Sequence, residues 1–205
     1  MVVALLPALP LAAQDHRALL ELGVGSLSPD DPFTAILSFR GSAGWILSHR
    51  NALSVDYTRQ SASRSTKEDL GKYARQFVGL SWQHSFREAF YDDEIHQQQY
   101  LLKLSGGFLL RGQTKDGDPV QNLAAAFFSG VALAIRYPLS SHIAAVGSLE
   151  DDIAFIPNQT IQTRCAFVGS TYTCYPVNSG TFYTLDLEGT VQHNFGLFVV
   201  VQWRP

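Results

Sequence analysis

Hydrophobic and polar residues alternate along most of this chain, and the alternation is most regular near its end, at residues 183–203. There the odd positions are mainly apolar, from Tyr183 to Trp203, while the even positions up to Asn194 are polar. A period of two is typical of a β-strand with one apolar and one polar face. Strands of soluble proteins usually have about five or six residues. We therefore interpret this segment as one unusually long strand.

Seven further segments repeat the same pattern and are separated by stretches rich in Gly, Pro, Ser or Asp. The eight expected strands cover about residues 18–26, 33–47, 53–58, 78–86, 100–111, 122–137, 143–155 and 183–203. An even number of strands allows an antiparallel barrel to close, as single-chain bacterial barrels do. The predicted fold is all-β: an eight-stranded antiparallel up-and-down transmembrane β-barrel.

The aromatic residues of the apolar face gather at the two ends of the predicted strands. One end carries all three tryptophans of the chain on the outward face, together with two tyrosines: Trp45, Trp82, Tyr100, Tyr137 and Trp203. Amphipathic rings collect at the headgroup layers of a membrane. We expect these five side chains to mark one membrane interface.

The inward face carries charged residues of both signs. They are Glu21, Arg40, Asp56, Lys103, Arg111, Arg136, Glu150, Asp152, Asp186 and Glu188. An eight-stranded barrel is only wide enough for side chains to fill it, so buried charges must pair with one another. The sequence predicts a lumen plugged by this polar network; a proton or ion path is the alternative. Asp151 has outward parity and must lie at the edge of the hydrocarbon or at a bulge, because charge at the bilayer midplane costs about 2–4 kcal/mol.

Composition supports a single membrane-embedded domain. The chain has 205 residues, a net charge of −3 and only 16% charged residues, so it offers no basic surface for nucleic acid. No apolar run approaches the roughly 20 residues of a transmembrane helix. We expect one barrel domain over residues 14–205.

Two parts of the sequence bear on export: the N-terminal segment and the cysteines of the last long loop. Residues 1–13 are apolar, end in small residues and predict a signal peptide that lacks its basic part. Export to an oxidising compartment favours a disulfide between Cys165 and Cys174, the only cysteines; two free thiols are the alternative. Both cysteines lie in the expected loop 158–180.

Motifs for catalysis or for a cofactor are weak. The six histidines have no metal-binding spacing, and no glycine-rich phosphate loop is present, so we expect neither cofactor nor metal. His142, Ser148 and Glu150 could suggest a hydrolase triad, but triads are recognised by geometry, not by sequence.

On these patterns the chain resembles the small eight-stranded outer-membrane barrels of the OmpA/OmpX type, over essentially everything after residue 17. The end Asn194-x-Gly196-x-x-Val199-x-Val201-x-Trp203 is similar to the C-terminal signal that the barrel-assembly machinery reads. The resemblance implies a monomer in the outer membrane of a Gram-negative-type envelope, in contact with outer-membrane lipids. Such proteins act as anchors, adhesins, binders of partners or lipid-modifying enzymes.

Three hypotheses of function follow. The first is a non-enzymatic barrel that acts structurally or binds an extracellular partner through loop 158–180. The second is a lipid-modifying enzyme such as a lipid A deacylase, although the His-x-Ser-Asn signature of those enzymes is absent. The third is a soluble lipocalin-like carrier, against which the outward tryptophans argue.

Overall fold

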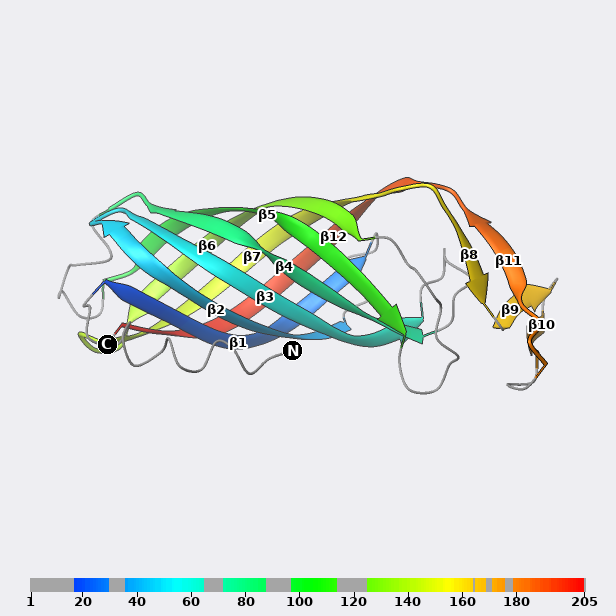
Figure 1. Ribbon diagram of the computed structural model, residues 1–205. Helices are drawn as coiled ribbons and strands as arrows, with labels where there is room; N and C mark the ends of the chain where they lie inside the picture. Colours follow the sequence, from blue (N-terminus) through cyan, green and yellow to red (C-terminus); the bar gives the residue numbers. More distant parts are fainter. Residues whose placement is uncertain are drawn as a thin grey trace.

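Eight long strands form the wall of a closed antiparallel barrel in the computed structural model (Figure 1). The strands are β1 (Ala18–Pro29), β2 (Ile36–Ser48), β3 (Asn51–Arg64), β4 (Lys72–Ser85), β5 (Gln99–Gln113), β6 (Ala126–Pro138), β7 (Ile143–Ile156) and β12 (Thr190–Trp203). Each of β1 to β7 pairs with the next, and β12 pairs with both β7 and β1. The predicted all-β, eight-stranded antiparallel barrel is confirmed.

The structure describes residues 17–29, 36–64, 72–87, 97–113, 125–163, 165–168, 171–175 and 179–204. The expected signal peptide, residues 1–13, lies outside these ranges and stays a prediction. Within them, no helix is long and apolar enough to cross a bilayer.

Two strands are longer than their apolar pattern predicts. β3 continues to Arg64 and β4 begins at Lys72, whereas the expected strands end at residue 58 and begin at residue 78. The ladder shifts between Gln60 and Ser63 and then resumes with Arg64 opposite Lys72. Backbone pairing needs no apolar side chains, so the strands extend past the end of the apolar pattern.

The expected strand 183–203 is divided into β11 (Tyr183–Leu187) and β12. β11 pairs with β8 (Gln159–Thr163). The β8–β11 ladder and the β7–β12 ladder are separated by a break of only two residues on each side. At the break, the Gly189 amide donates a hydrogen bond to the Asn158 side chain. A side chain at Gly189 would clash there, 2.8 Å from the Ile156 carbonyl oxygen. The alternation therefore persists through a local interruption of the ladder.

The region expected to be loop 158–180 contains further β-structure. The ribbon of β8 and β11 continues away from one end of the barrel, and a second hairpin of β9 (Cys165–Val168) and β10 (Thr171–Cys174) lies at its far end (Figure 1). We call residues 157–189 the arm. The C-terminus lies at the opposite end of the barrel.

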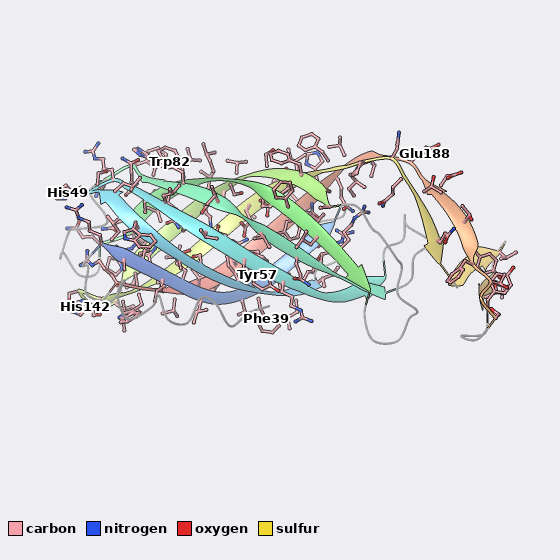
Figure 2. All side chains as sticks on the ribbon, viewed as in Figure 1. Phe39, His49, Tyr57, Trp82, His142 and Glu188 are labelled. Carbon is pink, nitrogen blue, oxygen red and sulfur yellow. The ribbon has the colours of Figure 1, made fainter. Side chains whose placement is uncertain are left out.

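Side chains alternate between the two sides of the wall, as the sequence predicts. In β2 the buried positions are every second residue from Ile36 to Ile46, and β12 shows the same pattern. Large apolar side chains face outward, with Leu22 73% and Leu149 64% exposed. Figure 2 shows Phe39 and Trp82 on the outside of the wall. An apolar outer surface of this extent is typical of a protein that contacts another apolar phase.

The lumen is filled by side chains from opposite walls. Phe198, Leu19 and Ile46 are buried in the half near Trp203, and Leu27 and Leu109 in the half near the arm. Polar side chains are buried among these apolar ones, and some of them, such as Arg111, lie closer to the arm than Leu109 does.

Small residues on the inner face of β6 make this packing possible. A Cβ atom added at Gly130 would lie 1.9 Å from Asp152 Oδ1 and 2.5 Å from Ser105 Oγ. The glycine therefore leaves the space that those two side chains occupy.

Candidate functional site

The centre of the lumen holds a buried ion pair between Arg40 of β2 and Glu150 of β7. Arg40 Nη1 donates to Glu150 Oε1 at 2.7 Å and to Oε2 at 2.8 Å, and Arg40 Nε donates to Thr58 Oγ1 at 2.9 Å. The guanidinium carbon also lies 3.9 Å from the centre of the Phe198 ring. The side chains of Arg40 and Glu150 are only 6% and 4% exposed, so each charge depends on these contacts for its solvation. The pair joins two strands that are not neighbours in the wall.

A second ion pair, Lys103 with Asp56, lies beside the first. Lys103 Nζ is 2.5 Å from Asp56 Oδ2, and Ser54 Oγ donates to Asp56 Oδ1 at 2.9 Å. Ser54 and Ser81 share a further hydrogen bond of 2.9 Å between their hydroxyls. Strands β3, β4 and β5 are thereby connected through the lumen.

Glu21 accepts three hydrogen bonds in the half of the lumen near the C-terminus. Ser42 Oγ donates at 2.8 Å, Gln202 Nε2 at 2.8 Å and Gln83 Nε2 at 3.1 Å. The oxygen of Gln202 accepts from Arg136 Nε at 2.6 Å, which links the arginine to the carboxylate through an amide. Three neutral donors, and a cation one side chain away, stabilise this buried charge.

Towards the arm the network continues with Arg75, Asn194 and Arg111. Arg75 Nη1 donates to Asn194 Oδ1 at 3.1 Å, and Asn194 Nδ2 donates to the Asp152 carbonyl at 2.8 Å. Arg111 is 7% exposed at the same end.

Little space remains between these groups. The cavity in the middle of the lumen has a volume of about 10 Å³ and is lined by Arg40, Asp56, Lys103 and Glu150 among others. Such a volume holds about one water molecule.

The structure brings eight of the ten predicted interior residues into the lumen, Asp152 among them. Asp186 and Glu188 are exceptions: both are exposed, and Thr160 donates to Asp186 on the surface of the arm. Figure 2 shows Glu188 at the base of the arm. Their parity is inward, but β11, which carries Asp186, pairs with β8 outside the barrel, and Glu188 lies in the break between β11 and β12. There is no lumen at either position for the side chain to enter.

Several lumen residues were missed. Gln83 and Gln202 are uncharged, and Arg75 and Gln99 lie in segments without a clear alternation. A search for polar residues of inward parity, rather than for charges alone, would have found Gln83 and Gln202.

The predicted interface aromatics all lie on the outer wall near the C-terminal end. Trp45, Tyr100, Tyr137 and Trp203 are 51%, 53%, 37% and 42% exposed, and Trp82 is partly exposed. Trp82 stacks on His84 with ring centres 5.4 Å apart. These side chains form one rim of the apolar outer surface.

Asp151 also lies on the outer wall, where it pairs with a histidine. Its Oδ2 is 2.9 Å from His193 Nδ1, on the neighbouring strand β12. His193 is ten residues from Trp203, which corresponds to about 25 Å of height for a tilted strand. That distance is similar to the height of the outward apolar band of outer-membrane barrels.

The arm carries aromatic and uncharged polar side chains. Tyr175 stacks on Tyr183 with ring centres 4.4 Å apart, and the Tyr183 hydroxyl is 3.1 Å from Thr173 Oγ1. Strand pairing places Cys165 directly opposite Cys174 at the base of the tip hairpin. The predicted disulfide between them stays a prediction.

Two members of the possible hydrolase triad, His142 and Glu150, do not come together. His142 is exposed in the turn before β7, whereas Glu150 is buried against Arg40. Within the described ranges, no three His, Cys, Asp or Glu side chains are close enough together to hold a metal ion.

Comparison with known proteins identifies the architecture. No protein-family profile and no curated protein sequence match the chain. Among solved structures it is similar to Neisserial surface protein A (NspA), with a TM-score of 0.61 and 12% identity over 92% of this chain and 97% of that one. A second match is the N-terminal β-barrel domain of Pseudomonas aeruginosa OprF, with a TM-score of 0.49 and 9% identity over 90% and 97%. The fold is that of the small eight-stranded outer-membrane barrels, as the sequence resemblance predicted.

Proposed function

We propose that this protein spans a bacterial outer membrane as a closed, non-conducting barrel and binds a partner outside the cell through its arm. The barrel anchors the arm in the membrane, and its lumen does not serve as a transport path. The observation that carries the proposal is the arm itself, a β-ribbon that projects beyond the apolar band at the end opposite the tryptophan rim.

The outer wall supports the membrane placement. Its apolar surface is bounded by the aromatic rim at one end and by the Asp151–His193 pair at the other. An aromatic rim matches a headgroup layer, and a charged pair on the outer wall fits the opposite edge of the hydrocarbon. Lipids of both leaflets would surround this band, and the expected signal peptide and assembly signal agree with export.

The interior supports a sealed lumen. Two ion pairs and the hydrogen bonds around Glu21 cross it, and buried apolar side chains occupy further space inside it. An ion would have to break buried charge pairs in order to pass.

The composition of the arm supports binding. It is rich in Tyr, Thr, Ser and Asn and carries few charges. Tyrosine supplies large contact area at low entropic cost, and small polar residues supply adaptable hydrogen bonds, the combination used by antibody paratopes. The free edges of the β8–β11 ribbon could also pair with an extended strand of a partner.

Surface labelling tests the orientation that binding requires. An epitope tag inserted between Ser179 and Gly180 should be stained by antibody on intact cells. The same tag inserted after Leu139, in the turn at the other end, should be stained only after the outer membrane is permeabilised. The reverse pattern, or staining of both tags on intact cells, would refute the proposal.

A further inference from the structure

The outer wall is hollowed over strands β5, β6, β7 and β12 in the half near the tryptophan rim. The groove has a volume of about 710 Å³ and an almost entirely apolar lining, including Leu133, Ile135, Leu149, Leu197 and Val199. Ligand sites of proteins usually measure about 300–1,000 Å³. The groove is therefore large enough for a specific molecule.

Gly147 forms the floor of the groove. It faces outward on β7, directly between Ile135 of β6 and Val199 of β12, and a Cβ atom added there would meet nothing within 4 Å. A glycine inside a strand weakens it and commonly marks a bulge or a close approach by backbone or ligand. The registers of β7 with both neighbours run without a shift, and no other part of the described chain covers this position. Among the described residues, neither a register shift nor a covering segment accounts for this glycine, and its missing side chain leaves room for a ligand.

The barrel end beyond the groove, near the C-terminus, is cationic. Below Trp203 and Ile143, which pair with each other, Arg204 is held against the turn by three contacts with Ser141 and His142. Arg204 Nη2 donates to the Ser141 carbonyl at 2.6 Å, and its backbone amide donates to the His142 carbonyl at 2.8 Å. The guanidinium is thus fixed close to the strand ends that lead into the groove.

The rest of the described rim has the same sign of charge. Arg17, Arg50 and Arg87 lie at this end, and the described residues of the rim include no Asp or Glu. The sequence 88–96 contains four acidic residues and lies outside the described ranges. Arginine suits phosphate because its planar fork of donors matches the oxygens.

We propose that the groove holds an acyl chain of an anionic phospholipid whose phosphate binds at Arg204. Four residues separate Gly147 from Ile143, about 13 Å along the strand, so one lipid molecule can reach both places. Tyr137, beside Ala145 in the ladder, lies between them at the level where a glycerol backbone would sit. This inference rests on the proposed membrane placement and adds a preferred lipid to it.

Native mass spectrometry tests the inference. The full-length protein is folded in vesicles of equal parts phosphatidylglycerol and phosphatidylcholine, extracted in mild detergent and weighed with its bound lipid. We expect the native protein to retain phosphatidylglycerol. Gly147→Phe, which fills the groove, should lower retained lipid about tenfold or more, a change of about 1.4 kcal/mol. Arg204→Gln should keep lipid binding but abolish the preference for phosphatidylglycerol.

Matched controls lie elsewhere on the same wall and rim. Gly41→Phe adds the same ring to the outer face of β2, and Arg50→Gln removes a charge from the same end; both should retain lipid as the native protein does. Equal retention by Gly147→Phe and native protein would overturn the inference, as would an unchanged preference in Arg204→Gln. A native dimer that Gly147→Phe dissociates would overturn it in favour of a second copy.

A gel of boiled and unboiled samples separates this inference from the proposed function. If the folded protein shifts on boiling but retains no preferred lipid, only the lipid site is wrong. If it shows no shift, the membrane barrel itself is wrong.

Discussion

Arg40 and Glu150 show how far individual residues of the lumen depend on one another. Glu150→Ala removes the carboxylate that binds Arg40 through two hydrogen bonds and leaves Thr58 and Phe198 in contact with it, with Asp152 and Asp56 as the nearby negative charges. We expect a loss of about 3–5 kcal/mol in the free energy of unfolding, because a buried charge without its partner is poorly solvated. Urea unfolding of the protein in detergent, followed by tryptophan fluorescence, measures it.

The control for this variant is Glu188→Gln, on the exposed arm, which should change stability by less than about 0.5 kcal/mol. The double variant Arg40→Met with Glu150→Leu should recover most of the lost stability, since apolar pairs replace buried ion pairs well. Equal stability of Glu150→Ala and native protein would show that this ion pair does not stabilise the fold.

Two glycines of the wall should respond in opposite ways to the same substitution. Gly130→Val places methyl groups on Asp152 and Ser105 inside the lumen and should lower stability by about 1–3 kcal/mol through overpacking. Gly147→Val points into open space and should leave stability unchanged or raise it. The same urea titration checks both, and a similar loss in the two variants would contradict the inward and outward assignment.

At the scale of the element, the arm requires a source of stability that the barrel does not need. An isolated two-stranded hairpin is marginal in water, and the arm consists of two such ribbons in series. Residues directly opposite each other in antiparallel strands have Cα atoms about 4.5–5.5 Å apart, within the range that a disulfide spans. The pairing of Cys165 with Cys174 therefore favours a bond between them.

We expect a disulfide that stabilises the arm alone. Cys165→Ser, or reduction of the native protein, should make the arm readily cleaved by protease while the barrel stays resistant. Mass spectrometry of the peptides, with and without reductant, identifies the bond directly. Free thiols in protein isolated from its envelope, detected by alkylation, would contradict the prediction.

The sequence predicted the strands of the barrel well where lipid and lumen impose opposite requirements. In β12 the period of two identified which side chains enter the lumen, including Asn194. The same period misassigned Asp186 and Glu188, because the pairing of β11 with β8 continues without a barrel around it. Strand ends such as Arg64 and Lys72 were missed because the backbone pairs there without an alternation of apolar and polar residues in the sequence.

Contacts across the lumen could not be predicted from sequence. Charges of both signs on the inward face required pairing, but the partners depend on which strands lie opposite each other after closure. Arg40 reaches Glu150 across β1 and β12, and the Gln202 amide links Glu21 to Arg136. The alternation determines which side of the wall a residue faces. It does not determine how high the residue lies along the barrel or which residue it contacts across the lumen.

For the whole molecule, a lumen crossed by ion pairs should conduct no ions. We expect purified protein in a planar bilayer to show no stepwise conductance in about 1 M salt. Salt at this concentration screens exposed charges but has much less effect on buried pairs. Glu150→Ala widens the central cavity but keeps the buried apolar side chains of the lumen. This variant should also show no conductance. Reproducible channels from the native protein would contradict the sealed lumen and favour an ion path.

The central claim is that this chain forms a closed barrel in an outer membrane, and electrophoresis of the folded protein tests it most directly. Protein folded in detergent or taken from membranes is loaded in SDS with and without boiling. A closed barrel keeps all of its backbone hydrogen bonds between strands and resists SDS, so the unboiled sample should migrate differently from the boiled one and should require detergent to stay dissolved. Identical migration of the two samples, with protein that stays soluble without detergent, would contradict the account.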